Sequence, residues 1–558
     1  MEYLEIKDLT FQYAGSNNLV LDNLSLSITQ GEFILICGTS GSGKSTLLKL
    51  LKPQLAPNGK QTGTIYLNNE SIDALPADFS TGKIGYVMQN PENQIVTESV
   101  WQELAFGLEN LGTPPSEIKS RIAEMVNFLG IEELLEHQTS ELSGGQMQLL
   151  NLTSVLLMKP DILILDEPTT QLDPITSQKF IDLIVRLNRE MGLTILLVEH
   201  SLESVFALAD QVIILDDGQV IFAGEPRSIS NGMKKNKNVD RFVYSLPSAV
   251  QIYLNSSVDD DCPLTVVEGK RFLARYFPFR SFLQKETLTK KKMVKSIQLK
   301  NCWFRYEKKS RDILAGIDFE VYTGEIFSLV GGNGSGKTTL LKVIAGILDC
   351  YHGKLSLFEQ SIKKNKGVVG YLPQESQMLF LKDSVIEEYK MYLQNQNVAE
   401  EDQKIRIKNV TTLLDLTKIL TQHPLDLSGG ECQRAALGKL LLTDSKILLL
   451  DEPTKGIDNF EKKQLIKLLK ELSKQGKTIL VVTHDLDFAA ELSDRCGLLF
   501  QNKLVTTAEP TAFFSHHTFY TTAASRISRD NFEGLVTTEQ VIKACRLVKG
   551  ASDEPRRD

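Results

Sequence analysis

The sequence predicts an α/β fold made of two copies of one domain, each with a mostly parallel central sheet. Two stretches occur twice in the same order: residues 31–51 return as 324–344, and residues 161–173 return as 446–458. Short apolar runs such as FILICG and ILILDE are typical of strands buried on both faces of a parallel sheet. Segments with helical apolar spacing, such as 176–192, lie between these runs. Alternating strands and helices predict an α/β sandwich that binds ligands at its strand ends.

The composition narrows the class of protein. The chain has 558 residues, more than the ~250–300 that one hydrophobic core supports, so several domains are expected. Its formal net charge is −8, and we expect no nucleic-acid partner. No apolar run approaches the ~20 residues of a membrane-spanning helix. The seven cysteines never occur as C-x-x-C, which favours a reducing compartment and argues against a zinc or iron–sulfur site.

Two glycine-rich loops indicate nucleotide binding. The sequences GTSGSGKS (38–45) and GGNGSGKT (331–338) match G-x-x-x-x-G-K-[ST], and each follows an expected strand and opens an expected helix. Backbone N–H groups of such a loop surround phosphates at a helix N-terminus. The lysine reaches the β- and γ-phosphates, and the hydroxyl after it binds Mg²⁺. We therefore expect ATP and Mg²⁺ as ligands, held by Gly38, Gly41, Gly43, Lys44, Ser45, Thr46, Gly331, Gly334, Gly336, Lys337, Thr338 and Thr339.

An Asp-Glu pair ends an apolar strand in each copy. Asp166 and Asp451 are expected to hold Mg²⁺ together with the loop hydroxyls. The glutamate that follows each of them can polarise or deprotonate the attacking water, so Glu167 and Glu452 are the expected catalytic bases. A helix cap is the alternative reading of such a pair. A proline follows directly in both copies, which indicates a rigid turn instead.

Three further residue types recur in register. His200 and His484 each end another strand, where they can stabilise charge and orient the water, and we predict them to be catalytic. A glutamine at each further strand end can touch Mg²⁺ or water and begin a mobile loop. A tyrosine about 31 residues before each loop lysine can stack on a purine, with core packing as its alternative role. These expected ligand contacts are Gln89, Gln374, Tyr13 and Tyr306.

Together with L-S-G-G at 142–145 and 427–430, these motifs resemble those of ATP-binding cassette proteins, with two P-loop NTPase domains of that type on one chain. In that family the L-S-G-G stretch begins a helix of a helical subdomain and caps the nucleotide of the partner domain, head to tail. The resemblance implies that the first stretch serves the nucleotide on Lys337 and the second serves the one on Lys44. The two halves would then supply the ATPase dimer, with added nucleotide contacts from Ser143, Gly145, Asp173, Ser428, Gly430 and Asp458.

A narrower resemblance concerns QNPENQIVTESVWQELAFGLENLG (89–112), which is similar to the Gln-loop region of energy-coupling-factor transporter ATPases. That resemblance implies ATP-driven uptake of a vitamin or metal ion at the cytoplasmic face of the cell membrane. The implied partners are a transmembrane scaffold protein and a substrate-capturing membrane subunit. The expected docking residues of this stretch are Ile95, Val96, Val100, Glu103 and Phe106. The matching stretch of the second half, 374–392, lacks this pattern.

The repeat also predicts domain boundaries. We expect nucleotide-binding domains at 1–225 and 293–508, an appendage and linker at 226–292, and a C-terminal helical appendage at 509–558. The appendages are expected because 264–277 resembles 535–548, so each copy has its own helical addition.

Two other functions fit the same motifs. A soluble tandem cassette ATPase that acts on ribosomes or RNA has similar loops, but usually carries a long charged helical linker. The ATPase of another type of ABC transporter would lack the 89–112 pattern. The transported substrate is chosen by a different polypeptide, so this sequence does not specify it.

Overall fold

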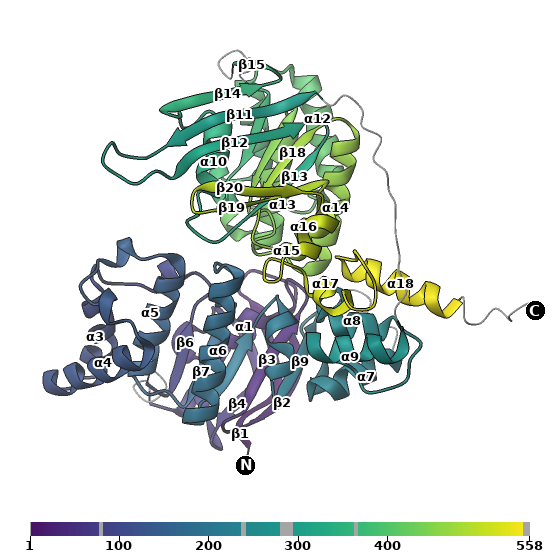
Figure 1. Ribbon diagram of the computed structural model, residues 1–558. Coiled ribbons are helices and arrows are strands. Elements are labelled where there is room, and N and C mark those ends of the chain that lie inside the picture. The colour runs from purple at the N-terminus through teal and green to yellow at the C-terminus, as the bar shows by residue number, and fades with distance from the viewer. Residues whose placement is uncertain (1, 77–81, 236–241, 279–293, 362–366, 551–558) are drawn as a thin grey trace, which may run out of the picture. The chain divides into compact units, whose positions relative to one another are not determined.

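Each half of the chain is built around a six-stranded sheet, which confirms the predicted α/β fold. The computed structural model describes residues 2–76, 82–235, 242–278, 294–361 and 367–550. These residues form two units, 1–265 and 266–558 (Figure 1). No helix among the described ranges combines the length and the apolar content that crossing a bilayer requires.

The first unit orders its central strands β10-β9-β3-β8-β7-β6, and the second orders its own β16-β17-β18-β13-β19-β20. Neighbours pair in parallel except at the β9–β10 and β19–β20 edges, which are antiparallel. Because β3, β7 and β8 are buried along their whole length, they form continuous apolar runs in the sequence. The strands are β3 (Phe33–Gly38), β6 (Ile84–Val87), β7 (Ile162–Asp166), β8 (Thr194–Val198), β9 (Gln211–Asp216), β10 (Gln219–Gly224), β13 (Ile326–Val330), β16 (Val369–Leu372), β17 (Ile447–Asp451), β18 (Thr478–Val482), β19 (Arg495–Phe500) and β20 (Lys503–Ala508).

Each unit also has a four-stranded antiparallel sheet, ordered β2-β1-β4-β5 or β12-β11-β14-β15. These sheets pack against the central sheet and the first helix around a shared apolar core. In β2, buried and exposed residues alternate, which hides such strands from a search for continuous apolar runs. The strands are β1 (Glu2–Tyr13), β2 (Leu21–Thr29), β4 (Gly59–Leu67), β5 (Glu70–Ser71), β11 (Lys295–Phe304), β12 (Leu314–Tyr322), β14 (His352–Leu357) and β15 (Gln360–Ser361).

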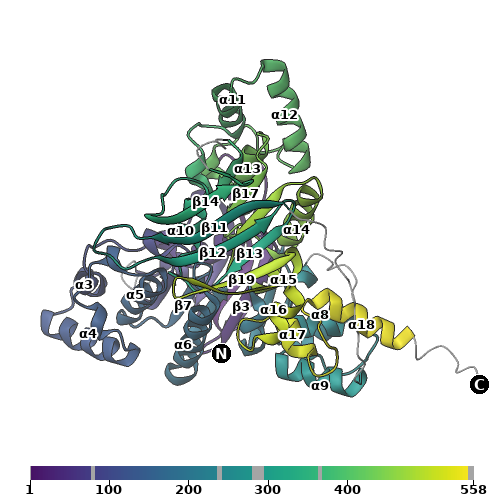
Figure 2. The same ribbon diagram turned by 45° about the horizontal axis from the view of Figure 1, so that its top comes forward.

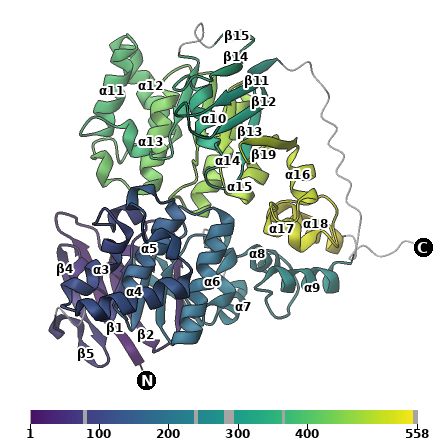
Figure 3. The same ribbon diagram turned by 60° about the vertical axis from the view of Figure 1, so that its left-hand side comes forward.

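A helical subdomain interrupts each unit between two central strands. In the first unit α3 (Val100–Asn110), α4 (Pro115–Leu129) and α5 (Gly144–Leu157) pack together around their own apolar core (Figure 3). In the second unit α11 (Val385–Asn395), α12 (Glu400–Leu413) and α13 (Gly429–Leu441) also pack together (Figure 2), but their apolar core is continuous with that of the central sheet. The helices that flank the sheets are α1 (Lys44–Leu50), α6 (Pro174–Met191), α10 (Lys337–Ile344), α14 (Asn459–Lys474) and α15 (Leu486–Leu492).

Short helices follow the last strand of each half. The first half continues with α7 (Pro226–Lys235), α8 (Ser248–Leu254) and α9 (Val266–Tyr276), and the second with α16 (Pro510–His516), α17 (Ala523–Ser528) and α18 (Thr538–Gly550). Although α9 precedes the second cassette in the chain, it belongs to the second unit and packs against α17. An ion pair of 3.0 Å joins the Lys270 ammonium to Asp530 there. The helical character expected of both appendages agrees with these elements.

Candidate functional site

The two glycine-rich loops join the central strand of each unit to its first helix. Gly43 caps α1 with a φ of 95°, and Gly336 caps α10 with a φ of 99°. A Cβ at either position would lie 2.7 Å from a backbone oxygen, that of Val20 or Ile313. Only glycine therefore fits there, both for its backbone conformation and for the close approach of the neighbouring chain.

Each loop lysine lies folded into its own loop. Lys44 is 5% exposed, and its Nζ donates to the carbonyl oxygens of Gly38 at 3.1 Å and Thr39 at 2.7 Å. Lys337 makes the same two contacts in the second unit, both at 2.9 Å, with Gly331 and Gly332. The cation is therefore held where phosphate oxygens approach a P-loop.

Two buried hydroxyl groups also point to an anionic ligand. Ser42 and Ser335 occupy the same place in the two loops, and the buried Oγ atom of each has no hydrogen-bond partner within the described part of the chain. Buried polar atoms are nearly always paired in proteins, so these hydroxyls need a partner. The oxygens of a bound phosphate group fit that need.

The expected Mg²⁺ ligands meet in both units. The Ser45 hydroxyl donates to Asp166 Oδ1 at 3.0 Å, and the Thr338 hydroxyl donates to Asp451 Oδ1 at 3.1 Å. Burial, and next the charge of the neighbouring Glu167, raise the pKa of Asp166. Burial also raises the pKa of Asp451, to about 6.

These hydroxyl and carboxylate oxygens are hard ligands that suit Mg²⁺. The described residues contain no group of three or more His, Cys, Asp or Glu able to hold a metal alone.

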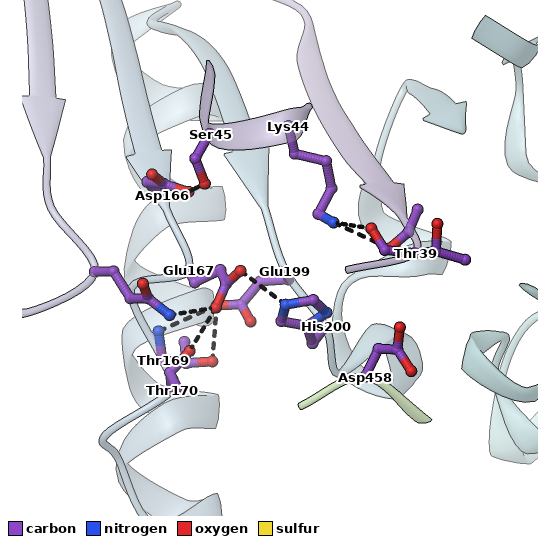
Figure 4. Close-up of polar contacts among 12 residues, drawn as sticks. Thr39, Lys44, Ser45, Asp166, Glu167, Thr169, Thr170, Glu199, His200 and Asp458 are labelled. Atoms are coloured by element: carbon purple, nitrogen blue, oxygen red, sulfur yellow. Dashed lines mark hydrogen bonds and ion pairs between the residues drawn. The ribbon is translucent and has the colours of Figure 1, made fainter. Parts of the chain in front are cut away.

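In the first unit the expected base and histidine form a tight pair (Figure 4). Glu167 Oε1 lies 2.7 Å from His200 Nε2, and Glu167 Oε2 accepts from Gln89 Nε2 at 2.6 Å. Burial alone would raise the pKa of Glu167, but the charge and hydrogen bond of His200, with help from Lys44 and Thr170, outweigh it and hold that pKa below its usual value. Glu167 is therefore ionised near neutral pH, as a base must be.

The second unit repeats the pair with different atoms. Glu452 Oε2 lies 2.9 Å from His484 Nδ1 and accepts the His484 backbone N–H at 3.2 Å. Burial works against the His484 cation, but the charge and hydrogen bond of Glu452 prevail and raise the pKa of His484. Gln374 is exposed, and within the described part of the second unit it makes no hydrogen bond to Glu452 like the one from Gln89 to Glu167.

Both glutamates expected to be the bases have left-handed backbone conformations, with φ of 47° at Glu167 and 49° at Glu452. Such conformations are uncommon for residues other than glycine and cluster at functional sites. In both units the glutamate N–H donates to the last residue of the neighbouring strand, Val198 at 3.0 Å or Val482 at 2.9 Å. The strained turn is thus fixed to the strand that carries the histidine.

The tyrosines expected beside the purine lie near the loops. Tyr13 is 36% exposed and Tyr306 is 59% exposed, so core packing is not their main role. Their hydroxyls bond to Thr46 Oγ1 at 2.9 Å and Thr339 Oγ1 at 3.1 Å. Each ring is therefore tethered to the helix that follows a phosphate loop, with much of its surface open.

The L-S-G-G stretches begin α5 and α13 with a capping box. The Ser143 hydroxyl donates to Gln146 Oε1 at 2.9 Å, and the Ser428 hydroxyl donates to Glu431 Oε2 at 2.8 Å. Asp173 caps α6 and Asp458 caps α14. The structure therefore places these expected nucleotide contacts at the beginnings of helices, where Ser143 and Ser428 are exposed and Asp458 is buried. Gly145 and Gly430 lie in the first turns of α5 and α13, which we call the signature helices.

Sequence reasoning missed several supporting side chains. The Tyr86 hydroxyl donates to Asp166 Oδ2 at 3.0 Å, and the Tyr371 hydroxyl donates to Asp451 Oδ2 at 3.3 Å. Each tyrosine stands three residues before the loop glutamine, and this recurrence was a usable signal. Glu199 is buried beside the Glu167–His200 pair, and the signal that could have revealed it is its difference from Thr483, the residue at the same place in the second copy.

Comparisons with known proteins agree with this geometry. A family model described as ABC transporter matches residues 21–170 and 314–455. A protein of Bacillus thuringiensis subsp. konkukian, provisionally named an ABC transporter ATP-binding protein, is 39% identical over 97% of this chain and 98% of its own length. A Methanosarcina mazei protein with the same provisional name is 31% identical over 90% of this chain and 88% of its own.

A solved structure shares the two-cassette fold. The archaeal ribosome recycling factor aABCE1, in complex with the ribosomal stalk protein aP1, aligns with a TM-score of 0.57 and 21% identity over 91% of each chain. With two matched ATP-binding domains and close relatives along nearly its full length, this chain belongs to the ABC transporter family as a two-domain ATPase.

Proposed function

We propose that the protein is the energy-coupling ATPase of an ABC importer of the energy-coupling-factor type, for a vitamin or a metal ion. Its partners would be a transmembrane scaffold protein and a substrate-capturing membrane subunit, which it would meet at the cytoplasmic face of the membrane. The names of its relatives favour a transport role. The observation that carries the proposal is an exposed apolar surface directly after the Gln89 loop.

This docking surface consists of Val96, Trp101 and Phe106, which are 67%, 38% and 39% exposed. Three large apolar side chains exposed within eleven residues of chain favour a protein partner. Two residues expected there from the sequence are instead buried: Val100 is 0% exposed and Glu103 is 5% exposed. Val100 belongs to the core of the helical subdomain.

The buried Glu103 fixes the loop that carries Val96. Its Oε2 accepts the backbone N–H groups of Val96 at 3.0 Å and Thr97 at 2.8 Å, and also the Thr97 hydroxyl at 3.0 Å. The loop is tied to the central sheet as well, since the Gln94 side chain accepts from the Met88 N–H at 2.9 Å and donates to the Tyr86 carbonyl at 3.1 Å. Movement of Gln89 against Glu167 could therefore move the docking surface with it.

The second half offers a related surface with other residues. Met378 is 71% exposed and Leu381 is 79% exposed, and Glu388 Oε2 accepts the N–H groups of Leu381 at 2.7 Å and Lys382 at 3.0 Å. The loop is held in the same way as its counterpart although it lacks the 89–112 pattern. We therefore propose that the membrane scaffold docks on both halves through two chemically different contacts.

The proposed reaction is hydrolysis of ATP in each cassette. Glu167 or Glu452 accepts a proton from a water, the water oxygen bonds to the γ-phosphorus, and the bond to the bridging oxygen breaks to release ADP. His200 or His484 holds the glutamate in place, and the loop lysine stabilises charge on the phosphate oxygens. Ser45 with Asp166, and Thr338 with Asp451, would hold Mg²⁺, which neutralises phosphate charge.

Membrane fractionation tests the transport role. We expect the native chain to co-purify with integral membrane proteins from detergent-solubilised membranes, and Val96→Asp with Phe106→Ala to lose them while retaining ATP hydrolysis. Met191→Ala removes an apolar side chain that is 58% exposed elsewhere in the first unit and serves as the matched control. Co-sedimentation of the native chain with ribosomes, without membrane partners, would overturn the proposal in favour of the soluble tandem cassette.

A further inference from the structure

Glu199 is an ionisable residue present in only one of the two catalytic centres. The first copy reads TILLVEH at 194–200, and the second reads TILVVTH at 478–484. A glutamate thus precedes His200, whereas Thr483 precedes His484. Both positions are buried, with 3% exposure for Glu199 and 0% for Thr483.

The Glu199 carboxylate is bound to the turn that follows the catalytic base. Glu199 Oε1 accepts the Thr169 backbone N–H at 3.1 Å and the Thr169 hydroxyl at 2.7 Å (Figure 4). Thr169 is two residues beyond Glu167, and Glu199 directly precedes His200. These two hydrogen bonds therefore join the segment that carries the base to the segment that carries the histidine.

This junction lies where the backbone most needs support. Glu167 has a left-handed conformation, and the next residues include Thr170, whose hydroxyl lies 3.4 Å from Glu167 Oε2. Strained conformations persist only when surrounding contacts fix them. A rotation of the turn would shift Glu167 away from His200, and small misplacements of reacting groups lower rates strongly.

The second cassette does without this junction. Thr454 stands where the first cassette has Thr169, but Thr483 Oγ1 accepts instead from the backbone N–H of Asp485 at 3.0 Å. No hydrogen bond links Thr454 to Thr483 in the described residues of that unit. Burial raises the pKa of Glu199 to about 7. Burial of an ionisable carboxyl group costs stability, and groups with strongly shifted pKa values cluster at functional sites.

We propose that Glu199 is a positioning residue of the first cassette, which holds the Thr169 turn so that Glu167 and His200 keep the geometry that hydrolysis requires. The second cassette uses a threonine at this place, so the two centres differ in how their bases are held. The inference rests on the catalytic role proposed for Glu167. It goes beyond that role because it assigns a function to a side chain that need not touch ATP.

Single-turnover hydrolysis isolates the first centre. In a Glu452→Gln background, one turnover needs only the first centre to react once, so coupling between the centres does not obscure the rate. We expect Glu199→Ala to lower the rate constant ~10-fold because the turn is released. The dissociation constant for ATP should change less than about twofold, since the phosphate loop is untouched. Glu199→Gln keeps an oxygen acceptor for Thr169 and should recover the rate to within about threefold.

A partner variant and two controls make the outcome decisive. Thr169→Val removes the hydroxyl donor and should also lower the rate, and combining it with Glu199→Ala should add little, since both changes break one junction. Thr483→Ala is assayed in a Glu167→Gln background, where only the second centre can react. It should not lower the single-turnover rate constant of that centre. A less than twofold effect of Glu199→Ala, additive effects, or failure of Glu199→Gln to recover would overturn the inference. If Glu167→Gln itself hydrolyses ATP at the native rate in the Glu452→Gln background, the catalytic assignment has failed instead.

Discussion

The buried carboxyl group of Glu199 makes the stability of the folded protein depend on pH. Its pKa of about 7 in the folded protein lies above its ordinary value of 4.5, so the folded state binds more protons than the unfolded state between these values. Stability is then unaffected at pH below 4.5, falls as the pH rises towards 7, and stays lower above 7 by about 3 kcal/mol.

We therefore expect Glu199→Gln to resist thermal unfolding better than the native chain at pH 8, with the advantage shrinking towards pH 5. The amide cannot ionise, so the pH-dependent penalty disappears. Differential scanning calorimetry of both proteins at several pH values measures the effect. An advantage that is the same at pH 5 and pH 8 would contradict the assigned burial of the charge.

At the same scale, sequence spacing predicted some site residues and not others. Lys44 and Ser45 lie within one contiguous motif whose backbone geometry fixes their relation to a phosphate, so the motif predicts their place. Tyr86 bonds to Asp166 across 80 residues of chain, and Glu199 bonds to Thr169 across 30. Such pairs form only when parallel strands meet in the sheet, and short-range patterns do not contain that information.

At the scale of elements, each helical subdomain binds the loop before its first helix through a buried glutamate, Glu103 or Glu388. The two glutamates differ in their other partners. In the second half, the buried Glu388 also pairs with the Lys439 ammonium at 2.6 Å, and Lys439 donates to the Leu379 carbonyl. In the first half, the oxygen of Glu103 that shapes the loop accepts from uncharged groups, and Ser154 stands on α5 where α13 has Lys439. The loop of the second half therefore depends on a buried ion pair.

We expect Glu388→Gln to destabilise the protein by ~3–5 kcal/mol, because it leaves the Lys439 charge buried without its counter-charge. Glu103→Gln should be milder, at ~1–2 kcal/mol, since an amide oxygen can still accept from the loop. Chemical unfolding of the intact chain compares the two. Adding Lys439→Met to Glu388→Gln should restore much of the loss, and equal losses for Glu388→Gln and Glu103→Gln would contradict this account.

Element by element, the strands of the central sheets were predictable and those of the outer sheets were not. Runs such as ILIL, the first four residues of β7, are apolar throughout because the strand is buried on both faces. From Leu24 on, β2 exposes alternate polar residues, so it contains no continuous apolar run and yields a weaker signal. Tyr13 ends β1 and Tyr306 follows β11 by two residues, so part of each expected nucleotide site rests on elements that the motifs did not reveal.

For the molecule as a whole, the repeated sequence predicts two similar centres, and the side chains make them unequal. The first has Glu199 behind its base and a Gln89 contact to Glu167, whereas the second uses the other ring nitrogen of its histidine. We expect the centres to hydrolyse ATP at different rates for this reason. Duplication thus preserves the reacting groups while the residues that hold them diverge.

The last prediction concerns the head-to-tail pairing of the halves that the resemblance to ATP-binding cassette proteins implies. If the signature serine of one half caps the nucleotide of the other, Ser143→Cys and Asn333→Cys should be joined by a short bismaleimide when ATP is bound. Glu167→Gln with Glu452→Gln would serve as the background, because loss of the bases prevents turnover and holds ATP in place. Peptide mass spectrometry identifies the linked residues.

The controls follow from the positions of the native thiols and from the first half itself. Six of the seven native cysteines are buried and react slowly, and Cys350→Ser removes the partly exposed one. Ser143→Cys with Ser40→Cys places both thiols in the first half and should not be joined, since there the signature helix would face a different nucleotide. Linking within the half but not across the halves is the result that rejects head-to-tail pairing, and linking without ATP would show that the nucleotide does not bring the two surfaces together.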